Sequence, residues 1–242
     1  MANQYLSEEL VAAVVGETAV VGGPEARHAV TVSRLAVGEV VRVGNGGGVV
    51  ASGTVTAVAP SEFRFTVEVV ETIERPQPAI WPAQALAKGD RDELAIQAAT
   101  ELGVDGLIPW TASRSISRWE GAKVAKGQER WSAVVREATK QSARAWLPEV
   151  GSLVNTKQLA VLAEDTRMIV LDPLAETSLT SIEPDRQDIV LVVGPEGGIS
   201  PAEFELLYAA GAIGARLGDG ILRTSTAGPA AIAVLSAKLG RW

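Results

Sequence analysis

The pattern of apolar positions is clearest at Ile189–Val193, where five consecutive apolar residues, most of them β-branched, predict a strand buried on both faces. The sequence Gly-Pro-Glu-Gly-Gly follows directly and predicts a sharp turn. Ser200, Pro201 and Glu203 then supply an N-cap, a first-turn proline and the acid of a capping box, so we expect a helix to begin there. Proteins of the α/β class hold nucleotide-like ligands at such a junction, although an ordinary strand-to-helix connection has the same pattern.

From about residue 80 onward, strand patterns alternate with helix patterns. This alternation predicts an α/β fold, a parallel sheet with helices on both faces. True knots are nearly absent from proteins, so the pattern by itself favours an unknotted, doubly wound sheet. The predicted strands are residues 80–86, 106–110, 168–171, 189–193 and 215–217, and the predicted helices are residues 91–102, 128–146, 201–210 and 229–239.

Residues 1–74 have a different pattern, rich in valine, glycine and threonine. Residues 40–43, 49–58 and 63–70 predict strands, with a helix at residues 26–34 and a hairpin signal at Asn45-Gly46. The pattern indicates a small β-barrel, and Pro76 and Pro78 mark a linker to a second domain at residues 75–242. Strand patterns carry no ligand information, so a barrel without a nucleic-acid role remains an alternative.

Composition narrows the class of protein. At 242 residues, 47% of them hydrophobic, the chain can bury a substantial core and has room for two domains. No apolar run approaches a membrane span, and residues 1–10 lack the basic, apolar start of a signal peptide. Without cysteine, and with His28 as the single histidine, the sequence has no thiolate nucleophile and no His/Cys metal cluster. We expect a cytoplasmic enzyme with no bound metal and no membrane partner.

Charge is distributed unevenly along the chain. The net charge is −7, yet residues 114–144 hold eight basic residues against three acidic ones. Arg136, Lys140 and Arg144 are spaced by four residues and fall on one face of the predicted helix. Such a stripe is either a solvated charged face or a surface that binds phosphates. The candidate RNA-binding residues are Arg114, Arg118, Arg136, Lys140 and Arg144, with Arg34 of the first domain as a further candidate.

A second glycine turn lies at residues 217–227, with the sequence Leu-Gly-Asp-Gly-Ile-Leu-Arg-Thr-Ser-Thr-Ala. Together with residues 194–203 it resembles the ribosomal RNA small-subunit methyltransferase E family, of the trefoil-knot (SPOUT) class. That family has Gly-Pro-Glu-Gly-Gly with a later Glu, and Leu-Gly-x-Arg-Ile-Leu-Arg-Thr-Glu-Thr-Ala. This chain departs at Gly220, where arginine is usual, and at Ser225, where glutamate is usual.

The resemblance runs along nearly the whole chain, and several separated motifs in the right order make it specific. Its further matches are Lys88, Glu93, residues 100–103 and Pro109 at the opening of the second domain, Arg130, Trp131, Gln141, Ser142, Arg144 and Pro148 in its centre, and His28, Arg34 and Gly38 in the first domain.

The resemblance implies a fold and an activity. Members of the family transfer a methyl group from S-adenosylmethionine to N3 of a uridine in 16S ribosomal RNA. For this chain that implies a PUA-like, RNA-binding barrel at residues 1–74 and a trefoil-knot methyltransferase domain at residues 75–242. It also implies a homodimer that acts on 16S ribosomal RNA in the assembled small subunit. Two alternatives stay open: a trefoil-knot methyltransferase acting on transfer RNA, and a non-enzymatic RNA-binding module with a vestigial pocket, which the departures at Gly220 and Ser225 keep open.

The chemistry needs few protein groups. The sulfonium methyl is already activated, so no covalent enzyme intermediate is required, whereas the proton on uridine N3 must leave. Arg223 and Glu196 are the catalytic candidates, although Glu196 could serve as an acceptor for backbone N–H groups and Arg223 as a structural ion-pair partner. The cofactor-binding residues implied by the resemblance are Leu171, Gly194, Pro195, Glu196, Gly197, Gly198, Leu217, Gly218, Ile221, Leu222, Arg223 and Thr224.

Overall fold

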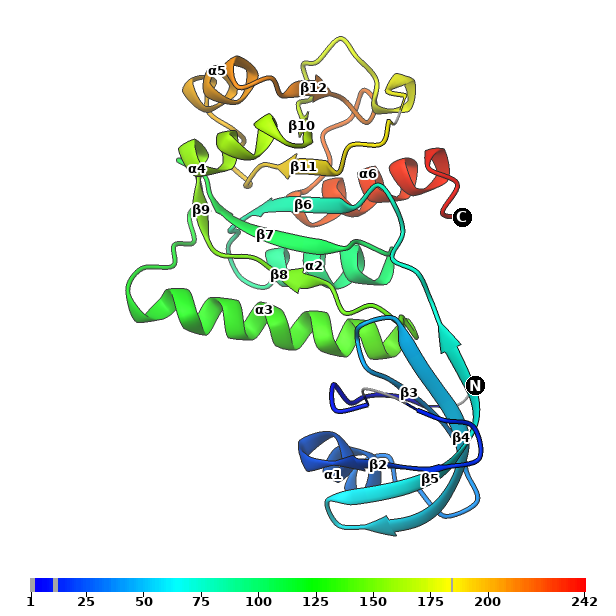
Figure 1. Cartoon of the computed structure of the whole chain (residues 1–242). Coiled ribbons are helices and arrows are strands. Elements are labelled where there is room, and N and C mark those ends of the chain that lie inside the picture. The colour runs from blue at the N-terminus through cyan, green and yellow to red at the C-terminus, as the bar shows by residue number, and fades with distance from the viewer. Residues whose placement is uncertain (1–2, 11–12, 184) are drawn as a thin grey trace. The chain divides into compact units, whose positions relative to one another are not determined.

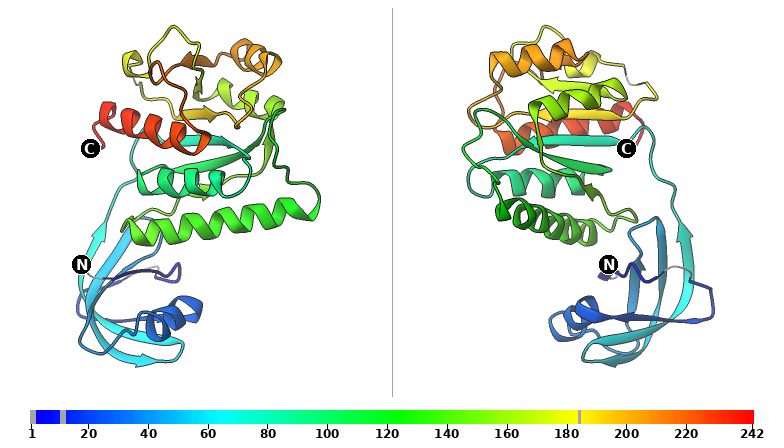
Figure 2. Two further views of the ribbon diagram at one scale, coloured as in Figure 1. Left: turned by 180° about the vertical axis from the view of Figure 1, so that it is seen from behind. Right: turned by 60° about the vertical axis from the view of Figure 1, so that its left-hand side comes forward.

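The computed structural model describes residues 3–10, 13–183 and 185–242, which form two compact units (Figures 1 and 2). The first unit extends to Arg75 and also takes in Thr139–Leu147, and the second consists of Pro76–Ala138 and Pro148–Trp242. The segment Thr139–Leu147 thus belongs with the first unit, although the sequence pattern placed it in the second domain.

The first unit is a curled sheet with strand order β1-β3-β4-β5-β2, in which only the β1–β3 pair is parallel. In β5, Phe63, Phe65 and Val67 are buried and alternate with less buried residues, as one-sided burial of a strand requires. The predicted Asn45 hairpin is confirmed, because Asn45 Oδ1 accepts from the N–H groups of Gly47 and Val49 between β3 and β4. The elements are β1 (Asn3–Leu6), β2 (Thr18–Gly22), α1 (Gly23–Thr31), β3 (Val40–Gly44), β4 (Val49–Ala59) and β5 (Glu62–Thr72). Sequence analysis missed β1 and β2.

The second unit is built on a parallel sheet with strand order β12-β10-β11-β6-β7-β8, and β9 also pairs with β7. Ile189–Val193, which forms β11, is buried along its whole length, as its unbroken apolar pattern predicted. The α/β class with a parallel sheet is therefore confirmed. The strands are β6 (Ile80–Ala85), β7 (Gly106–Thr111), β8 (Glu149–Val150), β9 (Val154–Asn155), β10 (Arg167–Leu171), β11 and β12 (Ile213–Ala215).

Helices cover both faces of this sheet (Figure 2). Helix α2 (Arg91–Glu101) packs with α6 (Thr224–Lys238) on one face, and α4 (Thr156–Val161) packs with α5 (Pro201–Ala209) on the other. Short 3-10 turns η1 (Leu162–Glu164) and η2 (Leu179–Ser181) complete the unit. In the part of the chain that the structure describes, no helix is long and apolar enough to cross a membrane.

Helix α3 (Ala122–Gln141) differs from its prediction at both ends. It stops at Gln141 because Ala143 adopts the left-handed conformation, with φ of 54°, and Arg144 N–H turns back to Thr139 O. The chain then runs beside the β3–β4 hairpin, where Gly48 N–H donates to Ala145 O. Arg144 therefore lies beyond the helix, and the predicted helical stripe does not extend to it.

The segment that follows β12 is hydrogen-bonded to an earlier loop. Arg216 N–H donates to Thr177 O, and Leu179 N–H donates to Arg216 O, so the segment after β12 lies against the loop between β10 and β11. Helix α6 then begins at Thr224, with Arg223 as its N-cap, rather than at residue 229 as predicted. The trefoil-knot fold implied by the resemblance likewise brings the last part of the chain next to a loop formed earlier.

Candidate functional site

A cavity of about 670 Å³ lies where β10, β11 and β12 end, at the carboxyl edge of the parallel sheet. Its size is typical of a small-molecule site, and this edge is where open α/β sheets bind ligands. It is lined by residues of the loops that follow these strands and by Arg91 of α2. Of the predicted cofactor-binding residues, those that line it are Leu171, Gly194, Pro195, Glu196, Gly198, Leu217, Gly218, Ile221, Leu222, Arg223 and Thr224.

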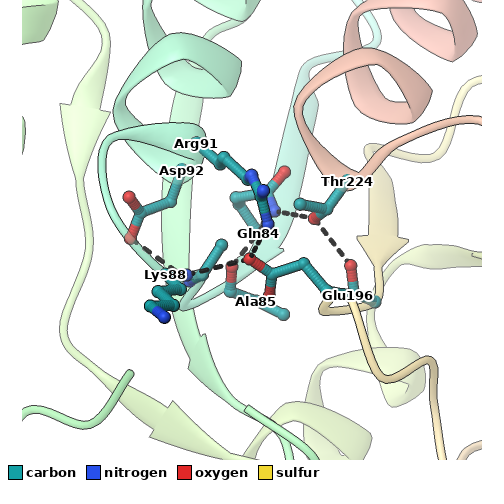
Figure 3. Close-up of polar contacts among 9 residues, drawn as sticks. Gln84, Ala85, Lys88, Arg91, Asp92, Glu196 and Thr224 are labelled. Atoms are coloured by element: carbon teal, nitrogen blue, oxygen red, sulfur yellow. Dashed lines mark hydrogen bonds and ion pairs between the residues drawn. The ribbon is translucent and has the colours of Figure 1, made fainter. Parts of the chain in front are cut away.

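The two glycine turns are joined by a buried relay of hydrogen bonds (Figure 3). Thr224 Oγ1 donates to Gly194 O at 2.7 Å and accepts from Gln84 Nε2 at 2.9 Å. Because the amide of Gln84 supplies the donor, the single hydroxyl proton of Thr224 is directed to Gly194 O. Sequence analysis missed Gln84; its signal was a polar residue inside an otherwise buried strand.

Glu196 is tied to the loop between β6 and α2. Its Oε1 accepts from Lys88 N–H at 3.0 Å and from Arg91 Nη1 at 2.9 Å (Figure 3). Burial works to raise the pKa of Glu196, but backbone N–H groups and Arg91 outweigh it, so the pKa lies below its ordinary value. A carboxylate held in this way is a weak proton acceptor near neutral pH.

Asp92 holds the same loop from its other side. Its carboxylate accepts from Ala87 N–H at 3.4 Å and from Glu93 N–H at 3.0 Å. Burial raises the pKa of Asp92 to about 6, and its hydrogen bonds only partly oppose this shift. Asp92 does not line the cavity, so its perturbed pKa reflects its structural position under the loop.

Arg223 is exposed at the mouth of the cavity, at the N-cap of α6. Among the described residues, its guanidinium has no hydrogen-bond or ion-pair partner. The ion-pair alternative is thus not what the structure describes, and the guanidinium is available to a ligand. The electropositive N-terminus of α6 lies beside it.

Two further charged groups line the cavity and were not singled out from the sequence. Asp172 accepts from Tyr208 Oη and from Leu174 N–H, both at 2.9 Å. Burial, together with the bond to Asp172, raises the pKa of Tyr208. Arg216 pairs through Nη1 with Asp219 at 3.1 Å.

Gly197 turns away from the cavity. A Cβ on Gly197 would lie 3.1 Å from Cβ of Arg114 and 3.2 Å from its carbonyl oxygen. Arg114 Nη1 also donates to Gly197 O at 3.2 Å. Gly197 therefore accommodates Arg114, whereas its predicted neighbour was the cofactor.

Glu203 anchors the loop that carries Arg114. The predicted capping box with Ser200 is confirmed, and Glu203 also accepts from Ser113 N–H and Ser113 Oγ, both at 2.7 Å, and from Thr156 Oγ1 at 2.9 Å. Burial opposes ionisation, but these hydrogen bonds prevail and lower the pKa of Glu203 to about 2. One carboxylate thus fixes the start of α5, the start of α4 and the chain after β7.

The predicted basic stripe is not a single surface. Lys140 pairs with Glu25 at 3.2 Å inside the first unit, and only 9% of its side chain is exposed. Lys140 thus serves in a largely buried ion pair, an arrangement that does not favour the predicted phosphate contact. Arg114 and Arg118 are exposed, and Arg136 is partly buried. In the first unit, Arg34 is exposed with a positive φ of 55°.

Comparison with known proteins identifies the family. The family model for an RNA methyltransferase domain matches residues 74–236, and the model for an RNA methyltransferase PUA domain matches residues 21–68. The chain is 39% identical to the ribosomal RNA small subunit methyltransferase E of Mycobacterium bovis over 94% of this chain and 89% of that one. The chain belongs to the ribosomal RNA small subunit methyltransferase E family.

Further members agree with this assignment. The methyltransferase E of Bacillus subtilis is 31% identical over 88% of each chain. The methyltransferase E structure from Neisseria gonorrhoeae, bound to S-adenosyl methionine, has a TM-score of 0.87, with 28% identity over 98% of both chains. A methyltransferase from Legionella pneumophila, in complex with the cofactor SAM, has a TM-score of 0.86, with 27% identity over 98% of both chains.

The two departures from the motif of methyltransferase E lie near the cavity. Gly220 lines it, and a Cβ at Gly220 would meet no atom within 4 Å. Packing therefore does not exclude the usual arginine there. Ser225, the second residue of α6, is partly buried and does not line the cavity.

Proposed function

We propose that this protein methylates N3 of a uridine in 16S ribosomal RNA with S-adenosylmethionine as the methyl donor. The observation that carries the proposal is the meeting of both family motifs around one cavity at the carboxyl edge of the parallel sheet. The names of its relatives and the cofactor bound in two similar structures support the same reaction.

The residues around the cavity fit this cofactor. Gly198 and Gly218 have φ values of 70° and 148°, backbone conformations that favour glycine and leave the main chain open to a ligand. Leu171, Leu217 and Ile221 offer apolar surface to a flat base. Charged side chains at the rim match the polar ends of the molecule.

The reaction places one clear demand on the protein. The cofactor supplies a methyl group activated by its sulfonium; the carbon–sulfur bond breaks as the carbon–nitrogen bond forms. N3 of uridine must lose its proton to become a nucleophile. Glu196 has a lowered pKa, and both oxygens of Asp172 already accept hydrogen bonds, so neither is arranged as a strong base.

We therefore assign the main catalytic part to Arg223. Its unpaired guanidinium and the N-terminus of α6 create a positive field at the cavity mouth. Such a field stabilises a deprotonated uridine, whose charge spreads onto its carbonyl oxygens, and the proton passes to water. Glu196, the other catalytic candidate, keeps a structural part in this mechanism and does not take the proton.

RNA binding is assigned to the first unit and to basic residues outside the cavity. Arg114 and Arg118 follow β7, and Arg114 contacts the first glycine turn, so phosphates bound there would lie beside the reaction site. Arg34 is the exposed candidate in the first unit, and Arg136 and Arg144 complete the set. We propose that the protein acts in the cytoplasm, as a homodimer, on 16S ribosomal RNA in the assembled small subunit.

Primer extension tests the reaction. A methyl group on N3 blocks the pairing edge of uridine, so reverse transcriptase stops at the modified base. We expect the purified protein and S-adenosylmethionine to create one new stop in the 16S RNA of small subunits taken from a strain that lacks this protein. A stop in transfer RNA instead would indicate the other substrate, and cofactor binding without any stop would indicate a binding module.

A further inference from the structure

The charged groups that line the cavity differ in what they leave free for a ligand. Among the described lining residues, Asp172 and Glu196 carry the carboxylates. Both oxygens of Asp172 are occupied, one by Leu174 N–H and one by Tyr208 Oη. Glu196 uses Oε1 for its bonds to Lys88 N–H and Arg91, and the carboxylate also accepts from its own backbone N–H; no other described residue donates to Oε2. Glu196 thus keeps an acceptor for a ligand.

Arg91 keeps donors in the same way. It is the first residue of α2 and lines the cavity, and its Nη1 donates a hydrogen bond to Glu196. Its remaining N–H groups donate to no residue in the described part of the chain, and its side chain is 48% exposed. Figure 3 shows the side chains of Arg91 and Glu196 meeting. The pair therefore offers unused donors and an unused acceptor side by side.

The other ion pair at the rim does not offer this combination. Arg216 pairs with Asp219, whose side chain is 99% exposed and does not line the cavity. Solvent screens such a carboxylate, so this pair offers the cavity only a positive charge. Glu196, in contrast, has a side chain that is only 21% exposed.

We propose that Arg91 and Glu196 form the subsite for the amino-acid end of S-adenosylmethionine. Arg91 binds the α-carboxylate, and Glu196 Oε2 accepts from the α-ammonium group. An amino-acid zwitterion carries one acceptor group and one donor group a single carbon apart, which matches an arginine–glutamate pair with free sites on both partners. The planar guanidinium is suited to two parallel bonds with a carboxylate. The inference rests on the proposed cofactor.

Ligands that lack one charged group test this subsite. Calorimetry would compare S-adenosylmethionine, decarboxylated S-adenosylmethionine, which keeps the amine, and 5′-methylthioadenosine, which lacks both groups. We expect Arg91→Ala to weaken S-adenosylmethionine binding by roughly 10- to 100-fold, the range for hydrogen bonds between charged groups, and to leave the other two ligands nearly unchanged. Arg91→Lys should restore part of the loss.

The variant Glu196→Gln should affect a different set of ligands from Arg91→Ala. It should weaken S-adenosylmethionine and its decarboxylated form alike, because both carry the amine, and should spare 5′-methylthioadenosine. Arg186→Ala is the matched control, because Arg186 is an exposed arginine that does not line the cavity and its loss should not change the ratio of affinities for the first two ligands. Melting temperatures would verify that each variant is folded.

Two outcomes would overturn the assignment. Equal weakening of all three ligands by Arg91→Ala would mean that Arg91 only supports the turn, and unchanged affinities would mean that it does not touch the ligand. If the wild-type protein bound none of the ligands, the proposed cofactor itself would be wrong, which separates that failure from failure of the subsite.

Discussion

The glycine turns that line the cavity and the basic segment at residues 114–144 were both singled out from the sequence. The structure brings the residues of the turns together but separates those of the basic segment. Of the residues expected at the cavity, all but Gly197 line it. The basic residues, in contrast, separate: Lys140 joins Glu25 in an ion pair, Arg144 lies beyond α3, and Arg114 packs on Gly197.

The glycine turns and the basic residues differ in what fixes their positions in the fold. Glycine turns after buried strands act through the backbone, and parallel strands bring their carboxyl ends to one edge of the sheet. A charged side chain has no such constraint, because its partner can come from any part of the chain. Lys140 and Glu25 are 115 positions apart. Motifs of backbone conformation therefore predicted location better than spacing of charge did.

The largest effect is expected at the cavity, from loss of Arg223. Removing one electrostatic contact to a developing anion typically lowers the rate by about 10²–10³. Arg223→Ala should reduce the single-turnover methylation rate by that factor with little change in melting temperature, and Arg223→Lys should recover little, because lysine lacks the planar fork. Lys157→Ala, which removes an exposed cation on α4, is the control. Lower stability with an unchanged rate on the folded fraction would refute this assignment.

Two glycine variants test whether the cavity and the basic segment are separable. Gly218→Val forces a side chain into a backbone with φ of 148°, which costs about 1–3 kcal/mol and should lower affinity for S-adenosylhomocysteine about 10- to 100-fold. Gly197→Val should instead displace Arg114 and weaken RNA binding more than cofactor binding. Calorimetry and filter binding measure the two affinities. Equal losses of cofactor affinity in both variants would place Gly197 in the cofactor site after all.

Glu203 links the glycine turn at the cavity to the basic segment. It accepts a hydrogen bond from Ser113, the residue before Arg114, and it caps α5, which follows the turn. Glu203→Gln should lower the free energy of unfolding by about 1–3 kcal/mol at pH 7, the range for hydrogen bonds to a charged group. The pKa of Glu203 is lowered to about 2, so its contribution is present above the unfolded pKa near 4.3 and is lost as pH falls toward 2. Urea unfolding at several pH values should show the two proteins converging in acid. A difference that persists at pH 2 would contradict this.

The smallest effect concerns salt. Arg114→Gln and Arg118→Gln should each reduce the slope of log affinity for RNA against log salt by about 0.7–0.9. Lys140→Gln should leave the slope unchanged, because Lys140 is paired with Glu25. A reduced slope for Lys140→Gln would show that it contacts RNA despite the ion pair.

The sequence by itself determined the features that depend on short stretches of chain. Unbroken or alternating apolar runs predicted the main strands of both units, such as β11 and β5, because burial of one or two faces imposes the period. The Asn45 hairpin and the Ser200–Glu203 capping box were predicted equally well, since each is closed by residues at most four positions apart.

Only the tertiary structure decided which side chains meet across long separations. The Arg91–Glu196 pair joins residues 105 positions apart, and the bond between Gln84 and Thr224 joins residues 140 apart. The recruitment of Thr139–Leu147 into the first unit depends on a left-handed residue at Ala143, where the helical pattern of the sequence simply continued. Such partners are selected by packing of the whole chain, and no local pattern of residues encodes them.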